Sequence, residues 1–292
     1  MDALPALSED WTPLPRGRVR MRRRDRVAWI QLHFPPANCY SLEMMRDLDE
    51  AVLAARFDRD VDVVVLAGEG DRFFCAGADV EMLKAADPEW KYHFCLHANE
   101  TLLRLEQTPK LVIAALNGHC VGGGLEVALA ADLRIARRPP EGGKPFWIGL
   151  PEVRLGVLPG TGGTQRLARA VGPARAIQWI AEERMLTPDQ ALEAGLVQRV
   201  ADFVDFERTV HEWAVSFTAP AKAARAVGHV KRAVVSGSEL PLAAGLALER
   251  ELQQRLFTAP DAAEGLAAFA EKREPRFRGF ADGAAVAGED VR

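Results

Sequence analysis

Several features that would direct a functional assignment are scarce or missing in this chain of 292 residues. Only four cysteines occur, none in the CxxC spacing of metal or redox sites, which favours a reduced, intracellular protein. No stretch approaches the roughly 18 uninterrupted apolar residues of a membrane span, and the acidic start lacks the apolar core of a secretory signal. The formal net charge of -4 argues against a nucleic-acid specialist. We therefore expect a cytoplasmic protein that binds neither membrane nor nucleic acid.

Sequence motifs of several enzyme classes are absent as well. No serine stands in the GxSxG turn of the α/β-hydrolases. His93 and His97 have the i, i+4 spacing of a zinc-binding helix, but no acid follows in HExxH fashion and no third ligand is evident, so we expect no metal. Cys75 and Cys120 have no His–Asp arrangement that would activate a thiol, and packing is their expected role.

What is present is ordinary globular composition, with 48% hydrophobic and 27% charged residues. The first half alternates β-branched runs with stretches of helical spacing, which is typical of an α/β fold, and Ser41 is placed to cap the first helix. The second half consists mostly of helical segments that open at Thr, Pro or Asp and stop at glycine. We predict strands at 26–32, 61–68, 110–118 and 132–136, and helices at 41–58 and 88–107.

These patterns divide the chain into four parts. Residues 1–23 form an N-terminal extension, of which the Pro-rich first part, up to residue 15, is expected to be a loose tail. A mixed core spans residues 24–205, and a helical region spans residues 206–280. The small-residue segment 281–292 is expected to be a disordered tail.

Three consecutive glycines, Gly122 to Gly124, lie between a predicted strand and an apolar run that carries one acid, Glu126. Backbone N–H groups at such a helix start attract negative charge, and glycine lets a ligand approach without a Cβ in the way. For the glycines alone, a tight turn where a helix packs on a sheet is the alternative. A dinucleotide fingerprint is excluded because no third glycine falls three residues on, and a P-loop because no Lys-Ser or Lys-Thr follows.

Two further segments narrow the interpretation. FFCAGAD (73–79) is a second glycine-containing turn after a strand, and GLPEVRLGVLPGTGGTQRL (149–167) places Glu152 in apolar company before a glycine-rich helix start. Together with NGHCVGGGLEVALAADLRIA (117–136), these segments resemble the crotonase superfamily, and within it the enoyl-CoA hydratases. The resemblance covers roughly residues 24–280. It implies a spiral of ββα units followed by a C-terminal α-helical region used for trimerisation.

Crotonases bind acyl-CoA thioesters and stabilise an enolate with two backbone N–H groups. The resemblance assigns these oxyanion donors to Ala78 and Gly123, and a water-positioning amide to Gly160. Hydratases of the family use two glutamates around one water, and Glu126 and Glu152 occupy both matching positions. The resemblance therefore implies a lyase of fatty acid and lipid metabolism that adds water to a 2-enoyl-CoA. No cofactor is needed, because CoA arrives on the substrate.

The local sequence suggests how the two glutamates divide the work. Glu126 lies in the first turn of the helix after the glycines, where the helix dipole favours the ionised form that a base needs. Glu152 lies in an apolar segment, where desolvation favours the neutral acid that delivers a proton to the α-carbon. A structural role for Glu152, as an N-cap or in a salt bridge with Arg154 or Arg166, is the alternative.

The resemblance also implies residues that contact CoA. Lys272 and Phe277 would reach the nucleotide from a neighbouring subunit of a homotrimer or a dimer of trimers. Asp79, like Asp132, also suits a structural role at a turn or helix end. The candidate CoA-binding residues are Ala37, Asn38, Ala76, Asp79, Lys272 and Phe277.

Two segments depart from the family pattern and keep alternatives open. The inserted surface loop at 138–146 lies close to Glu152 in sequence and leaves the acyl group undetermined, so an enoyl-CoA isomerase, or a hydratase of a branched or cyclic acyl-CoA, is an alternative. A non-catalytic RNA-binding relative would use the arginine-rich segment 16–26. That segment lacks interleaved aromatics, and a solvated edge strand blunted by charge is the favoured interpretation.

Overall fold

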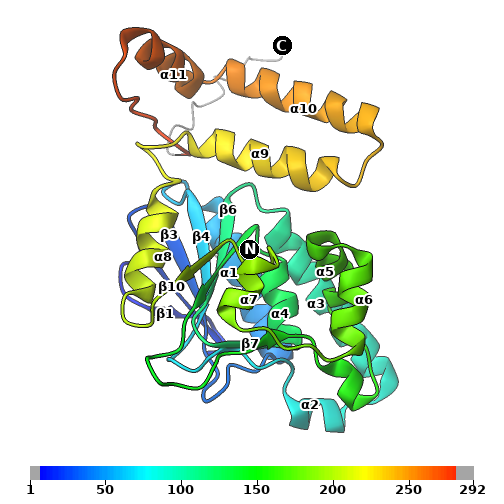
Figure 1. Ribbon diagram of the computed structural model, residues 1–292. Helices are drawn as coiled ribbons and strands as arrows, with labels where there is room; N and C mark the ends of the chain where they lie inside the picture. The colour runs from blue at the N-terminus through cyan, green and yellow to red at the C-terminus, as the bar shows by residue number, and fades with distance from the viewer. Residues whose placement is uncertain (1–6, 281–292) are drawn as a thin grey trace, which may run out of the picture.

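The computed structural model describes residues 7–280, so the tail predicted at 281–292 lies outside the described residues. Its centre is a seven-stranded sheet, and a three-stranded sheet lies beside it (Figure 1). In sheet order, the larger sheet contains β1 (Thr12–Pro13), β2 (Val19–Arg24), β3 (Val27–Leu32), β4 (Val63–Gly68), β6 (Leu111–Leu116), β8 (Leu133–Arg137) and β10 (Arg199–Ala201). The smaller sheet contains β5 (Phe73–Cys75), β7 (His119–Val121) and β9 (Ile148–Gly149).

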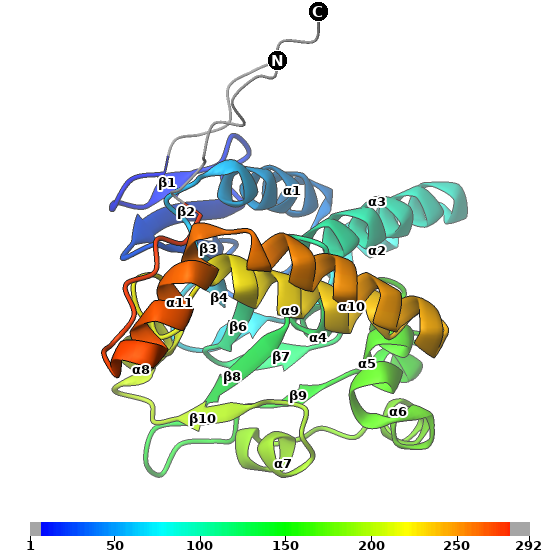
Figure 2. The ribbon, with the colours of Figure 1, turned by 90° about the horizontal axis from the view of Figure 1, so that it is seen from above.

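The strands from β3 to β10 pair in parallel, and so do those of the smaller sheet, whereas β1 and β2 pair antiparallel. Helices connect the parallel strands and cover both faces of the larger sheet (Figures 1 and 2). The helices are α1 (Leu42–Phe57), α2 (Val80–Ala85), α3 (Pro88–Glu106), α4 (Gly123–Leu129), η1 (Glu152–Leu155, a 3-10 helix), α5 (Gly163–Val171), α6 (Pro173–Ala181), α7 (Pro188–Glu193), α8 (Phe206–Val215), α9 (Ala224–Gly237), α10 (Leu242–Phe257) and α11 (Pro260–Glu271).

The predicted central strands form because their apolar runs are buried on both faces. Every residue of β4 and β6 is buried, as expected for parallel strands with helices on either side. Val64 faces the larger core cluster, which includes α1 and α3, and Val65 faces the smaller cluster, which includes α8. Ser41 caps α1 by accepting a hydrogen bond from the Met44 amide, as the sequence predicted.

The N-terminal segment differs from the prediction of a loose tail. Between residues 7 and 15, β1 pairs with β2, and Leu14 is only 3% exposed because it joins the main core. Consequently β2 lies between β1 and β3 and is not the edge strand that we predicted for residues 16–26. Its arginines are held by carboxylates and aromatic rings: Arg20 pairs with Glu69, Arg22 with Glu207 and the Trp11 ring, and Arg23 with Asp58.

The C-terminal helices extend away from the sheet. Helix α9 packs on the start of β6, where the Lys231 ammonium donates to the Lys110 carbonyl, and α10 packs along α9 (Figures 1 and 2). Leu252 is the buried residue of α10, whereas Leu242 and Phe257 are exposed. Within residues 7–280, no helix combines the length and apolar character needed to cross a membrane.

Candidate active site

The glycine cluster forms the start of α4, immediately after β7. Gly122 is the N-cap with φ 57°, a backbone conformation that favours glycine, and no side chain caps the helix. A Cβ on Gly123 would lie 2.0 Å from Cε1 of Tyr40, and one on Gly124 would lie 2.2 Å from the Cys75 carbonyl oxygen. Close packing therefore requires glycine at both positions, which agrees with the alternative of a tight turn where a helix packs on a sheet. The same packing leaves the first amides of the helix without a side-chain cap.

The turn that carries Ala78 lies against this helix start. Tyr40 donates its amide to the Gly77 carbonyl and accepts from the Asp79 amide, so the Ala78 N–H points away from Tyr40. On the other side, a Cβ built on Gly77 would lie 3.3 Å from the Gly123 nitrogen. Between residues 7 and 280, no backbone acceptor is found for the Ala78 or Gly123 amide. Two neighbouring amides are thus left for a negatively charged oxygen.

Glu126 is the buried carboxylate of the first turn of α4, as predicted, and it is 1% exposed. Its Oε1 accepts hydrogen bonds from the amides of Thr161 (2.8 Å) and Gly163 (2.7 Å). Its Oε2 accepts one from the Thr161 hydroxyl. Three donors thus orient the carboxylate, and hydrogen bonds to a charged group are stronger than those between neutral groups.

Glu152 begins the 3-10 helix η1, and its side chain is partly buried. Oε1 lies 3.2 Å from the position of a Cβ on Gly122, and Oε2 is buried without a hydrogen-bond partner. Burial first, and the charge of Glu126 second, raise the pKa of Glu152 from 4.5 to about 7. The two glutamates therefore have contrasting environments beside the same helix start.

The structural alternatives for Glu152 are wrong. Arg154 pairs with Glu183 at 2.5 Å, and Arg166 pairs with Glu106 at 3.0 Å. Glu152 follows the N-cap position of its helix and makes no capping hydrogen bond there. No described cation or cap thus explains why a carboxyl group is buried at this position.

Replacing Glu152 by glutamine is expected to stabilise the fold at alkaline pH. Because the folded pKa of about 7 exceeds the ordinary 4.5, the folded protein keeps a proton that the unfolded chain releases, and stability falls as pH rises through this window. Thermal unfolding at about pH 5 and about pH 8 should show a melting-temperature advantage of Glu152→Gln that grows with pH. An advantage that stays constant between the two pH values would contradict the buried, raised carboxyl group.

Gly160 lies in the loop whose next amides bind Glu126. Its carbonyl accepts a weak hydrogen bond from the Asn99 side chain (3.4 Å), and a Cβ there would lie 3.3 Å from Sγ of Cys95. Sequence analysis missed Thr161, which supplies an amide and a hydroxyl to Glu126. The sequence feature that could have predicted this role is a single hydroxyl residue inside a glycine-rich loop that follows a buried acid in the chain.

Two of the predicted CoA contacts have structural roles. All polar atoms of the Asn38 side chain are engaged, since Oδ1 accepts from the Phe34 amide and Nδ2 donates to the carbonyls of Glu69 and Phe73. Asp79 caps α2 by accepting from the Met82 amide at 2.9 Å. These interactions give both side chains structural roles, and contacts of Asn38 and Asp79 with CoA stay predictions.

The other predicted CoA contacts lie in two separate places. The Ala76 amide donates to the Ala37 carbonyl at 3.0 Å, so these residues form one loop pair near the Ala78 turn. Lys272 ends α11 with φ 56° and is exposed, and the Phe277 ring lies 3.3 Å from a Cβ built on Gly265. Figure 1 shows α11, which Lys272 follows, well separated from α4, with α9 between them.

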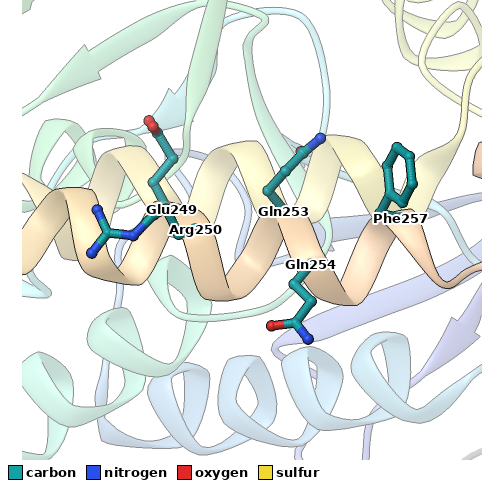
Figure 3. Close-up of a pocket in the computed structure, with 5 residues that line it drawn as sticks. All are labelled: Glu249, Arg250, Gln253, Gln254 and Phe257. Atoms are coloured by element: carbon teal, nitrogen blue, oxygen red, sulfur yellow. The ribbon is translucent and has the colours of Figure 1, made fainter.

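Two large hollows of the surface are lined by residues other than the glutamate pair. One, of about 460 Å³, runs along the exposed side of α10 between Glu249 and Phe257 (Figure 3). The other, of about 490 Å³, lies on the face of the larger sheet that packs against α8, and Trp29 and Arg137 are among the residues that line it. Neither is lined by paired acids beside unbonded amides, so Glu126 and Glu152 stay the predicted catalytic pair. Within residues 7–280, no group of three or more potential metal-ligating side chains occurs.

The parallel-sheet architecture and this helix start define an enzyme of the crotonase fold. A sequence model described as enoyl-CoA hydratase/isomerase matches residues 22–280, and the chain belongs to that family. It is a hydro-lyase that acts on acyl-CoA thioesters.

Two curated relatives illustrate the similarity. A short-chain-enoyl-CoA hydratase of Clostridium acetobutylicum is 34% identical over 257 residues, covering 88% of this chain and 95% of the relative. A 2,3-dehydroadipyl-CoA hydratase of Escherichia coli is 36% identical over 266 residues, covering 88% and 97%. The crystal structure of an enoyl-CoA hydratase from Geobacillus kaustophilus superposes with a TM-score of 0.85 and 44% identity, covering 90% of this chain and 97% of that one. The predicted superfamily and fold are confirmed.

Proposed function

We propose that the protein adds water to the double bond of a 2-enoyl-CoA, with the amides of Ala78 and Gly123 as the oxyanion hole. Glu126 acts as the base and Glu152 as the acid. The observation that carries this proposal is the contrast between the two buried carboxyl groups at one helix start. Glu126 accepts three hydrogen bonds, whereas Glu152 has an unpartnered oxygen and a pKa raised to about 7.

The steps follow from these environments. Glu126 removes a proton from water, whose oxygen bonds to the β-carbon, and the electrons of the double bond move onto the thioester oxygen. The Ala78 and Gly123 amides hold the resulting enolate oxygen, and each such donor is worth about 3 kcal/mol of barrier. Glu152 then delivers its proton to the α-carbon, and dehydration reverses the roles. The Gly160 amide supports the water, and no cofactor or metal takes part.

The C-terminal region supports the proposal that chains associate as a homotrimer or a dimer of trimers. Leu242 is 78% exposed and Phe257 is 66% exposed, so one chain leaves apolar parts of α10 uncovered. In such an assembly Lys272 and Phe277 would meet the CoA of a neighbouring subunit. We also propose a cytoplasmic location, which the four free cysteines support.

The acyl group is the least determined part of the substrate. The two relatives are named for a short-chain enoyl-CoA and for 2,3-dehydroadipyl-CoA, which differ in length and charge. The loop at 138–146, between β8 and β9, is mostly exposed and lies shortly before Glu152 in sequence, which supports a role for it at the acyl end of the site. A branched or cyclic acyl-CoA, or isomerisation of a 3-enoyl-CoA, is the second candidate.

A panel of acyl-CoA substrates tests the proposal. Purified protein should abolish the conjugated-enone absorbance of crotonyl-CoA or of a longer or branched 2-enoyl-CoA. The hydration rate should fall as pH rises through about 7, because the acid form of Glu152 is then lost. Conversion of a 3-enoyl-CoA to the conjugated isomer without hydration of any 2-enoyl-CoA would overturn the assignment in favour of an isomerase.

A further inference from the structure

The carboxylate of Glu126 is held so that only one of its oxygens is suited to take a proton. Oε1 accepts two backbone amides from the Thr161–Gly163 turn, which fill its two lone-pair directions. Among the described residues, Oε2 accepts only the Thr161 hydroxyl, which leaves one lone pair of this oxygen for a water molecule. The carboxylate is therefore oriented by the loop, and Oε2 is the basic atom.

The Thr161 hydroxyl is itself held by a second hydroxyl. Tyr40 Oη lies 3.3 Å from Thr161 Oγ1, and both residues are buried, at 3% and 0% exposure. An ionised carboxylate only accepts, so Thr161 donates to Glu126 and has no second proton to give. The Tyr40 hydroxyl must then donate to Thr161, and burial raises the pKa of Tyr40 well above its ordinary value, so it keeps this proton.

Packing holds Tyr40 where its hydroxyl can donate to Thr161, whose own hydroxyl donates to Glu126. Its ring lies directly under the Cα of Gly123, where a Cβ would come within 2.0 Å of it. On its other side it stacks on Phe94 with ring centroids 5.7 Å apart, and Phe94 stacks on Trp90. One rigid side chain thus supports the helix start that carries the oxyanion amide and the hydroxyl that serves the base.

We propose that Tyr40 and Thr161 are positioning residues of the reaction, which orient Glu126 and hold its Oε2 in the ionised, proton-accepting form. This inference rests on the proposed hydration and deepens it. The titratable and charged groups near the cluster are Glu152, Cys75, Cys95 and Arg166, and the variants below leave all of them in place.

The test compares Thr161→Val, which keeps the volume but loses the hydroxyl, with Thr161→Ser, which keeps the hydroxyl. Loss of one hydrogen bond to a charged group should lower kcat on the order of tenfold to a hundredfold in Thr161→Val, with KM little changed. The acid side of its pH–rate profile should move upward, because the base has lost a hydrogen-bond donor. Thr161→Ser should restore both, and Tyr40→Phe should shift the profile the same way by less.

The outcomes separate this inference from the proposed function. If the wild type hydrates an enoyl-CoA but Thr161→Val has an unmoved pH profile, or Thr161→Ser is as slow as Thr161→Val, the positioning role is wrong and hydration stands. If the wild type hydrates no enoyl-CoA, the proposed function itself fails. Circular dichroism shows whether each variant folds. If Thr161→Val does not fold, Thr161→Ala, which needs no extra room, takes its place in the comparison with Thr161→Ser.

Discussion

Glu152→Gln lowers the hydration of a 2-enoyl-CoA by about a thousandfold, the loss expected when a positioned general acid is removed. Glutamine fills the same space under Gly122 but has no proton that it can deliver to the α-carbon. Because a carboxyl group with a pKa of about 7 is about half protonated at neutral pH, the substitution changes the mean charge of the site by less than one unit and should leave substrate binding nearly unchanged. Steady-state kinetics should therefore show the loss in kcat, with KM close to that of the wild type.

Glu183→Gln is the matched control for this substitution. Glu183 follows α6 and pairs with Arg154, which lies on the same 3-10 helix as Glu152. This variant should hydrate within a few-fold of the wild type, as expected for loss of an exposed ion pair. Equal losses in Glu152→Gln and Glu183→Gln would mean that η1 is merely sensitive to change and that Glu152 is not the acid.

Glu126→Gln is expected to have an effect as large, about a thousandfold on kcat, through the loss of the base. A glutamine amide cannot take a proton from water. Its carbonyl oxygen can still accept the amides of Thr161 and Gly163, so the loop around it should keep its shape. Unlike Glu152→Gln, this variant should gain no stability at alkaline pH, because Glu126 is held by donors and is not left unpartnered.

Glu106→Gln is the control for the second substitution. Glu106 pairs with Arg166, which also touches the Thr161 carbonyl, so this variant perturbs the same loop without touching the acid–base pair. Near-normal turnover in Glu106→Gln, beside a large loss in Glu126→Gln, assigns the effect to the base. A Glu126→Gln protein that hydrates at the wild-type rate would refute the base assignment.

The parts of the fold that sequence predicted are those whose cause is local. Runs of β-branched residues predict the strands β4 and β6, and Ser41 predicts the start of α1. Both signals arise from residues that are neighbours in the sequence. The place of β2 in the sheet could not be predicted in this way. It depends on β1 pairing with its outer side, and nothing local in Thr12–Pro13 indicates a strand.

The same distinction holds for the candidate site. Apolar neighbours predicted the desolvation of Glu152, and the glycines predicted an uncapped helix start, because both effects arise within a few residues. The structural role of Asn38 could not be predicted, because its side-chain amide donates to carbonyls of residues 69 and 73, more than 30 positions away in sequence. Thr161 was missed for the same reason, since its partner Glu126 is 35 positions away.

The most direct test of the central claim is proton exchange at the α-carbon of a saturated acyl-CoA, such as butyryl-CoA, in deuterated water. This exchange needs the oxyanion amides and the residue that carries the α-proton, but no attack by water on the β-carbon. Mass spectrometry should show deuterium incorporation by the wild type and by Glu126→Gln, and none by Glu152→Gln. Exchange that survives in Glu152→Gln, or that is lost in Glu126→Gln alone, would contradict the roles assigned to the two glutamates.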